Sequence, residues 1–229
     1  MSIYPVTVLY QLHKEYGAKF APHEKWQLAE SFPGGSQAEI RHTEKGCCIF
    51  DRSHCGLFRL YGENIVNLLF EVYTGELNEA PQINCGALKF PEQPDLEVKV
   101  LAMSPEDYLM LLDTAATPEL KNFLLKHFTE AHFQDLTDIL ARQVIYGKAA
   151  KTVLTGPFAL TELPEAGCWQ KLVVAEVNAI TLCTAKDREY RMIFDADYAE
   201  GMWEEFCDTP DVKPSGFAAY EKLHSSAEN

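Results

Sequence analysis

The chain has 229 residues, of which 47% are hydrophobic, and a formal charge of −14. A chain of this length buries about 70% of its unfolded surface, so it forms a substantial core. A membrane protein is excluded because no apolar run approaches the roughly 18 residues that cross a bilayer, and the acidic charge without clustered Lys and Arg argues against nucleic acid as a partner.

The first third of the chain is predicted to hold three helices and two strands. In chain order they are helix 6–16, helix 36–45, strand 47–50, strand 57–61 and a helix that follows Gly62. Ser36 and Glu39 have the spacing of a capping box, which predicts that the second helix starts there. The two strands flank a polar turn at 51–56.

The remaining two thirds alternate between groups of strands and single helices. The predicted elements are strands 96–102 and 107–113 in one sheet, helix 117–128, strand 140–145, a short helix, strands 171–177, 180–184 and 190–194, and helices 198–206 and 216–223. Thr117 and Pro118 are typical of a capped helix start. Asn178 and Ala179 are predicted to form a hairpin turn, because Asn tolerates a left-handed backbone.

Strands grouped in twos and threes between single helices favour an α+β fold with antiparallel pairing over a doubly wound parallel sheet. Strands followed by a helix occur in each half of the chain, which suggests two related subdomains. The sequence contains no Gly-rich phosphate loop, so the two commonest nucleotide-binding motifs are absent.

The seven cysteines are an odd number scattered over the chain, which predicts reduced thiols rather than a disulfide framework. Cys47, Cys48, His54 and Cys55 lie close together, but they lack a CxxC pair, so no metal site is expected. The amino-terminal segment lacks the pattern of a signal peptide, and we therefore expect a cytoplasmic protein.

The polar turn 51–56 combines Asp51, Ser53, His54 and Cys55. A hydrolase triad is disfavoured there, because consecutive turn residues point in different directions. The favoured interpretation is structural, with Asp51 and Ser53 bonding turn amides and His54 in the core. Elsewhere, Asp95 and Glu97 would share one face of a strand, about 7 Å apart, either as a paired acid in a cleft or as a solvated strand end.

One run of sequence resembles a known family. AEIRHTEKGCCIFDRSHCGLFRLYGEN, residues 38–64, is similar to a signature of the glycine-cleavage T-protein (aminomethyltransferase) family, and Asp51-x-Ser53-His54-x-Gly56 is its most specific part. The runs EDYLMLLDTAATPELKNFL and SGFAAYEKL resemble later family segments. The resemblance implies a single α+β folate-binding domain over 1–229, with two interleaved lobes at approximately 1–115 and 116–229, and without the family's C-terminal barrel.

The resemblance also implies site residues, although several differ from the family's pattern. Asp95 is the expected catalytic acid if it serves from a position one residue on from the family's; otherwise the family's acid is missing in this chain. Three residues are expected at the cofactor: Cys55 where the family has Met, Asp113 where it has the pterin-binding Asn, and Tyr220 where it has Arg. A carboxylate at Asp113 still accepts two N–H bonds from a pterin edge.

The resemblance implies that the chain binds tetrahydrofolate and takes part in aminomethyl or methyl transfer. The chain is then expected to be a one-carbon transferase if Asp95 serves as the catalytic acid. Its expected partners are a small-molecule folate and a carrier protein or complex partner, with no metal, nucleic acid or membrane. The alternative is a catalytically inactive T-protein-like subunit or adaptor in a larger complex. A cysteine-dependent hydrolase is a third, weaker hypothesis.

Overall fold

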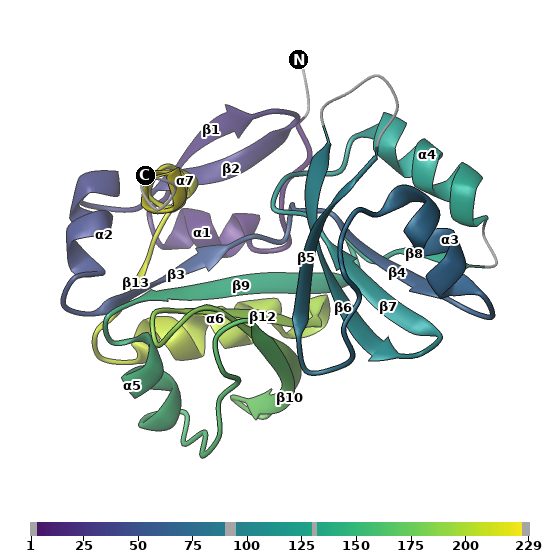
Figure 1. The fold of residues 1–229 in the computed structure, drawn as a ribbon. Coiled ribbons are helices and arrows are strands. Elements are labelled where there is room, and N and C mark those ends of the chain that lie inside the picture. Colours follow the sequence, from purple (N-terminus) through teal and green to yellow (C-terminus); the bar gives the residue numbers. More distant parts are fainter. Residues whose placement is uncertain (1–3, 90–94, 130–131, 226–229) are drawn as a thin grey trace. The chain divides into compact units, whose positions relative to one another are not determined.

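The computed structural model describes residues 4–89, 95–129 and 132–225, and its backbone groups into two compact units (Figure 1). Unit 1 comprises Met1–His54, Leu140–Ala166 and Gln170–Asn229, and unit 2 comprises Cys55–Ile139 and Gly167–Trp169. These units end at positions other than residue 115. The division into compact units does not test whether the chain is a single folate-binding domain with two interleaved lobes at approximately 1–115 and 116–229, and this stays a prediction.

Unit 1 is built on a six-stranded sheet in the order β10-β11-β12-β9-β3-β13. Its strands are β10 (Cys168–Val174), β11 (Val177–Ala185), β12 (Glu189–Asp195), β9 (Leu140–Gly147), β3 (Cys47–Asp51) and β13 (Val212–Pro214). The pairs from β11 to β3 are antiparallel, and β13 joins β3 in parallel. A separate hairpin is formed by β1 (Lys19–His23) and β2 (Trp26–Ser31).

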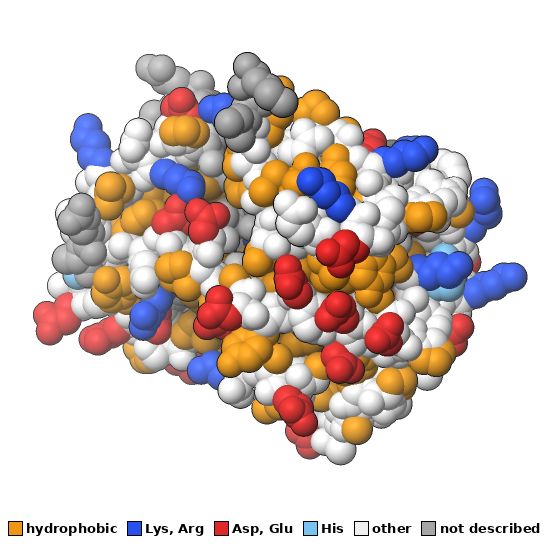
Figure 2. Space-filling view, turned by 180° about the vertical axis from the view of Figure 1, so that it is seen from behind, with side chains coloured by type: hydrophobic (Ala, Val, Ile, Leu, Met, Phe, Trp, Pro, Cys, Tyr) orange, Lys and Arg blue, Asp and Glu red, His pale blue; other side chains and the backbone are white. Residues whose placement is uncertain are grey.

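The surface is acidic, as the composition requires. Figure 2 shows a broad group of acidic side chains near the centre of the face that it draws, with Lys and Arg mostly away from it. An anionic ligand therefore has to be held by local groups rather than by the field of the whole chain. None of the described helices is long and apolar enough to cross a membrane.

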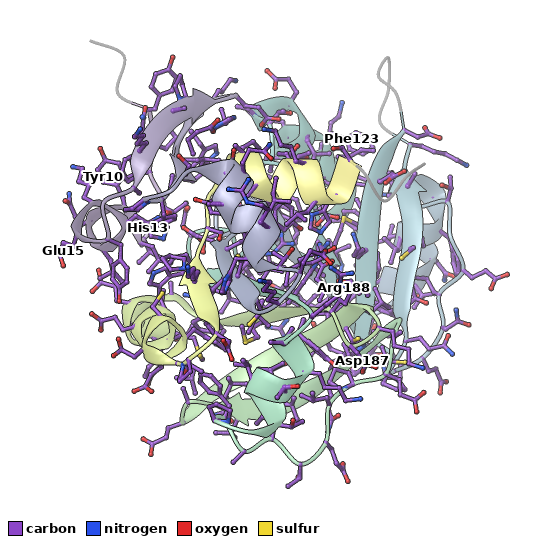
Figure 3. All side chains as sticks on the ribbon, turned by 90° about the vertical axis from the view of Figure 1, so that its left-hand side faces the viewer. Tyr10, His13, Glu15, Phe123, Asp187 and Arg188 are labelled. Atoms are coloured by element: carbon purple, nitrogen blue, oxygen red, sulfur yellow. The ribbon has the colours of Figure 1, made fainter. Side chains whose placement is uncertain are left out.

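Strand β3 is buried on both of its faces. Cys47 and Ile49 pack into a cluster with α1 (Tyr10–Glu15), α5 (Ala150–Thr155) and α6 (Ala199–Asp208), whereas Cys48 and Phe50 pack with α7 (Phe217–Ser225). A strand covered on both sides needs a continuous apolar run, which is what residues 47–50 provide. Figure 3 shows His13 pointing inward from α1, where its ring lies 4.5 Å from that of Trp203.

Unit 2 is built on a five-stranded sheet in the order β5-β6-β7-β4-β8. The strands are β5 (Ile83–Leu88), β6 (Leu96–Ser104), β7 (Asp107–Leu111), β4 (Leu57–Tyr61) and β8 (Phe133–Asp135). The helices α3 (Ile65–Val72) and α4 (Pro118–Phe128) share one apolar cluster with Val98, Val100 and Ala102 of β6. Because these three positions alternate along β6, both helices cover the same face of the sheet.

The α+β prediction is confirmed, as are several of its elements. The strands predicted at 96–102 and 107–113 are the adjacent antiparallel pair β6 and β7. Thr117 caps α4, with its Oγ1 accepting a hydrogen bond from the Leu120 N–H at 3.2 Å. The helix predicted at 198–206 is α6, and its Met202, Trp203 and Phe206 are buried in the core of unit 1.

The predicted capping box is wrong. The helix α2 (Ser36–His42) has Gly35 as its N-cap, without a side-chain hydrogen bond. The Glu39 carboxylate instead accepts hydrogen bonds from the Phe32 N–H at 2.6 Å and the Gly216 N–H at 3.1 Å. The buried Glu39 therefore joins residues far apart in the chain, and local spacing alone does not reveal this contact.

The predicted hairpin turn at Asn178 and Ala179 is also misplaced. The turn lies at Ala175 and Glu176, whose φ angles are 46° and 64°. Two positive φ angles in a two-residue loop match the twist of the flanking strands. The twist therefore places the turn at Ala175 and Glu176, although Asn178 tolerates a left-handed backbone better than either residue. The hairpin β1–β2 and strand β5 were not predicted, because their partly exposed residues lack a clear apolar alternation.

The turn between β10 and β11 generates a stability prediction. We expect Glu176→Gly to stabilise the protein by about 1 kcal/mol, because glycine adopts the left-handed backbone at that exposed position without steric strain. Thermal unfolding measures this as a raised melting temperature. The matched control is Glu200→Gly in α6, where glycine should lower it. A lower melting temperature for Glu176→Gly would contradict the assigned turn.

Candidate functional site

The polar turn after β3 is held by its own hydrogen bonds. The Ser53 N–H donates to Asp51 Oδ1 at 2.9 Å, and Ser53 Oγ accepts from the Arg142 N–H at 3.1 Å. His54 is buried, with 4% of its surface exposed. The structural interpretation is confirmed for Asp51, which bonds a turn amide, and for His54, which is buried, whereas Ser53 Oγ bonds an amide of β9 rather than one of the turn.

His54 is not suited to acid–base chemistry at neutral pH. Burial lowers the pKa of His54 to about 3, and the neighbouring charge of Arg52 acts in the same direction. The imidazole is therefore neutral near pH 7 and is too weak a base to accept a proton at that pH. A Ser53–His54 hydrolase site has no support from this geometry.

The thiols near this turn are structural. Burial raises the pKa of Cys47 and of Cys48 to about 12, so neither is a thiolate at neutral pH. Cys55 has no exposed surface, and its Sγ donates to the Asp113 carbonyl at 3.5 Å. No group of three or more His, Cys, Asp or Glu side chains among residues 4–89, 95–129 and 132–225 is arranged to hold a metal ion.

Within unit 2, Cys55 and Asp113 are brought together by backbone pairing. The Gly56 N–H donates to the Thr114 carbonyl and the Leu112 N–H to the Gly56 carbonyl, both at 2.9 Å, which continues the pairing of β4 with β7. Asp113, the second residue after the end of β7, forms an ion pair through its carboxylate with Lys99 Nζ of β6. Because 43% of the Asp113 side chain is exposed, a ligand can reach this carboxylate.

Asp95 lies immediately before β6 and is exposed. Glu97, two residues further on, is also exposed and lies opposite Ala87 of β5. Asp95 precedes Lys99 by four residues, which is roughly 13 Å along an extended strand. The two acids thus lie at a solvated strand end, the plainer of the two interpretations of this pair.

Tyr220, the fourth predicted site residue, is a core residue of unit 1. Only 3% of its surface is exposed. Its ring lies 5.4 Å from Phe50, stacks on His224 at 3.9 Å and has the Arg52 guanidinium 4.1 Å above it. A ring enclosed on these sides contributes to packing between α7 and β3, and a ligand does not reach it from solvent in unit 1.

A buried carboxylate of the sheet contacts His224 near the end of α7. Glu189 of β12 accepts from Arg191 Nε at 2.7 Å and lies 3.1 Å from His224 Nε2. Burial by itself raises the pKa of Glu189, but Arg191 and His224 outweigh it and lower that pKa to about 2. Because a buried charge is costly unless it is paired, this carboxylate depends on both partners.

Comparison with known proteins identifies the family. The model of the GCVT N-terminal domain family matches residues 9–227, nearly the whole chain. The chain belongs to the GCVT N-terminal domain family.

Similar proteins extend this family membership to the fold. Aminomethyltransferase from Nostoc sp. is 24% identical over 236 residues, covering 96% of this chain and 62% of that protein. The crystal structure of glycine cleavage system aminomethyltransferase T from Bartonella henselae superposes with a TM-score of 0.84 at 19% identity, covering 99% of this chain and 63% of that chain. The GCVT-family chain therefore spans about three fifths of the length of these relatives.

A second solved structure has the same fold in a different assembly. A chain of heterotetrameric sarcosine oxidase from Corynebacterium sp. U-96 superposes with a TM-score of 0.56 at 16% identity. The match covers 74% of this chain and 88% of that chain, so the fold also forms most of one subunit of a larger complex.

Two residues of this GCVT-family chain were missed by sequence reasoning. Lys99 lies in the predicted strand 96–102 without an assigned role, and the structure pairs it with Asp113. Arg52 lies in the polar turn 51–56 without a predicted role, and in the structure its guanidinium lies 4.1 Å from the centre of the Tyr220 ring. The register of β6 against β7, which places Lys99 opposite Leu111, was the signal that would have found Lys99.

The buried contact of Glu189 generates a pH prediction. The pKa of Glu189 lies below the ordinary glutamate value of 4.5, so its stabilisation is fully present above pH 4.5 and is lost as the pH falls toward 2. We expect Glu189→Gln to lower the free energy of unfolding by on the order of 3 kcal/mol near pH 6, with the deficit shrinking below pH 4.5. Urea unfolding between pH 2.5 and 7 measures it.

The control for this experiment is Glu44→Gln, at an exposed glutamate that also pairs with basic side chains. It should change stability little at any pH, because exposed ion pairs are screened by solvent. A deficit of Glu189→Gln that stays constant from pH 7 to pH 2.5 would contradict the assigned role.

Proposed function

We propose that this chain binds a reduced folate and takes part in one-carbon transfer of the aminomethyl or methyl type. The observation that carries the proposal is the family match over residues 9–227, combined with an exposed carboxylate at Asp113. The similarity to aminomethyltransferases covers their first three fifths, so the activity of the whole relatives is proposed for this chain and not transferred outright. The cytoplasm is the proposed location.

The residues of unit 2 fit a pterin at Asp113. A pterin edge presents neighbouring N–H donors, and a carboxylate accepts such a pair with charge-assisted hydrogen bonds. Lys99 holds the carboxylate in place from β6, and the Cys55 thiol holds the backbone of the same residue. In this proposal Cys55 positions Asp113 by bonding its backbone carbonyl. A direct contact between Cys55 and the pterin stays a prediction.

The proposed acid–base residue is Asp95. When bound, tetrahydrofolate would supply the nitrogen that exchanges the one-carbon unit. A single carboxylate is sufficient to move the proton that accompanies such a transfer. Asp95 is exposed at the start of β6, so it can exchange protons with solvent and be approached by a substrate.

A second candidate function is an inactive subunit or adaptor in a larger complex, and the position of Tyr220 favours it. The resemblance places a cofactor-facing Arg there, whereas Tyr220 is buried under the Arg52 guanidinium. The fold likeness to a chain of the heterotetrameric sarcosine oxidase supports the same candidate. A carrier protein or complex partner is proposed in both cases.

Folate binding at Asp113 is tested by calorimetric titration with 5-formyltetrahydrofolate. We expect micromolar affinity, a loss of at least tenfold for Asp113→Ala, and retained affinity for Asp113→Asn, because an amide oxygen still accepts a hydrogen bond from the pterin. Asp138→Ala, at an exposed aspartate before β9, is the matched control and should bind normally. Absent or millimolar binding by the unmodified protein would leave the adaptor function.

The role of Asp95 is tested by turnover. We expect Asp95→Ala to lower folate-dependent one-carbon transfer from an aminomethyl donor by a factor of 10² to 10⁴, roughly what a positioned general acid or base contributes, while folate affinity changes little. Glu97→Ala, two residues along the same exposed strand end, is the control and should retain its rate. Unchanged turnover in Asp95→Ala would remove Asp95 from the proposal.

A further inference from the structure

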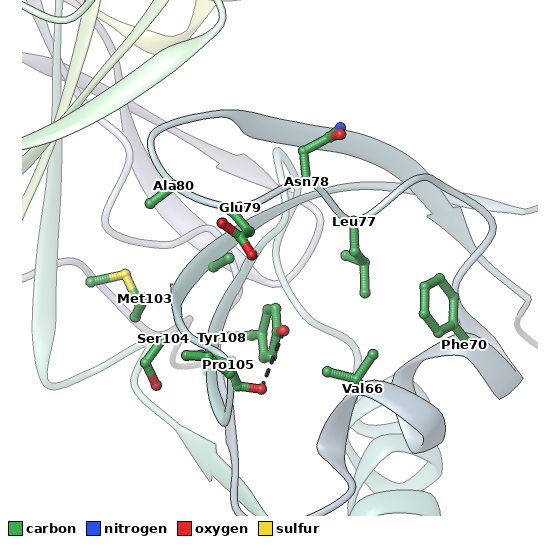
Figure 4. Close-up of a pocket in the computed structure, with 11 residues that line it drawn as sticks. Val66, Phe70, Leu77, Asn78, Glu79, Ala80, Met103, Ser104, Pro105 and Tyr108 are labelled. Atoms are coloured by element: carbon green, nitrogen blue, oxygen red, sulfur yellow. Dashed lines mark hydrogen bonds between the residues drawn. The ribbon is translucent and has the colours of Figure 1, made fainter.

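Unit 2 contains a hollow that the proposed function does not use. It lies between α3, the segment before β5 and the turn between β6 and β7, and has a volume of about 450 Å³ (Figure 4). Small-molecule sites in proteins usually measure about 300 to 1,000 Å³, so the hollow has the size of a ligand site.

The walls of the hollow are mostly apolar. Val66 and Phe70 come from α3, Leu77 from the segment before β5, and Met103 from the end of β6. Figure 4 shows Val66 and Leu77 extending into the same space from opposite sides. Half of the Phe70 side chain is exposed at the rim, an arrangement that leaves apolar surface in contact with water until a ligand covers it.

One charge faces this apolar space. Of the described side chains that line the hollow, Glu79 carries the only formal charge, and its carboxylate turns toward Tyr108 in Figure 4. Burial raises the pKa of Tyr108, and the nearby negative charge of Glu79 adds to this effect, which agrees with their proximity. Within residues 4–89, 95–129 and 132–225, no Lys, Arg or His forms an ion pair with Glu79.

We infer that this hollow binds a small organic cation, namely a primary or secondary ammonium group that carries an alkyl or aryl body. The carboxylate of Glu79 accepts a charge-assisted hydrogen bond from the ammonium group. Tyr108 lies on the Glu79 side of the hollow in Figure 4 and offers an aromatic ring close to the same charge, and the apolar walls, Phe70 among them, cover the organic body. An anionic ligand is repelled both by Glu79 and by the formal charge of −14.

The hollow is separate from the carboxylate proposed for folate. Met103 lines the hollow, and Lys99, the partner of Asp113, precedes it by four residues on β6. Four residues of an extended strand span roughly 13 Å, so Met103 at the end of β6 is well separated from Lys99 in its middle. Binding of the cation can therefore be measured whether or not the chain binds folate.

The test is calorimetric titration with three ligands that share a phenyl body: 2-phenylethylammonium, 2-phenylethanol and phenylacetate. We expect the ammonium to bind at least about tenfold more tightly than the alcohol, and phenylacetate not to bind. Glu79→Gln, a change at an exposed residue, should remove the preference for the ammonium while leaving the alcohol unaffected. Leu77→Trp should fill the hollow and abolish binding of both.

The matched control is Glu106→Gln, which removes an exposed carboxylate from the turn between β6 and β7 outside the lining of the hollow. It should leave the preference for the ammonium unchanged. Equal affinities for the ammonium and the alcohol in the unmodified protein would overturn the inference. So would equal losses in Glu79→Gln and Glu106→Gln, because the effect would then reflect general charge.

Discussion

The burial of β3 on both faces is the constraint on which unit 1 depends. Strand β3 carries apolar side chains on both faces, and each face is exposed to water unless another element covers it. Helices α1, α5 and α6 therefore pack on one face and α7 on the other. The chain must therefore return at its end to cover Cys48 and Phe50. The buried carboxylate of Glu39 and the stacking of Arg52 on Tyr220 secure that return.

The same strand sets the position of the chemistry. Where β3 ends, its turn is closed by Asp51 and Ser53, and the chain passes into unit 2 through Cys55, whose thiol holds the backbone of Asp113. The most specific motif of the family is thus a structural element in this chain. The partly exposed carboxylate of Asp113 is the group proposed for a ligand, and the Cys55 thiol within the motif bonds the backbone carbonyl of the same residue.

The two proposed binding places use one strand in different ways. In its middle, β6 presents Lys99 to the partly exposed carboxylate of Asp113, and near its end Met103 lines an apolar hollow in which Glu79 is the only charged side chain among the described residues. The first place suits a flat ligand with N–H donors, and the second suits an ammonium with an apolar body. The formal charge of −14 attracts the ammonium, whereas a ligand that carries negative charge has to be held at Asp113 by local hydrogen bonds against that field.

The sequence by itself determined the α+β class, the cap of α4 and the family, because strand grouping, capping residues and the Asp51-x-Ser53-His54-x-Gly56 motif are local patterns. Asp113 was also predicted from the resemblance, but its partner Lys99 was not. Only the tertiary structure decided that Glu39 bonds Gly216, that Tyr220 lies in the core and that Glu79 faces a hollow. Each of these depends on contacts between residues distant in the chain, and the burial and pairing that such contacts create have no signature in the spacing of neighbouring residues.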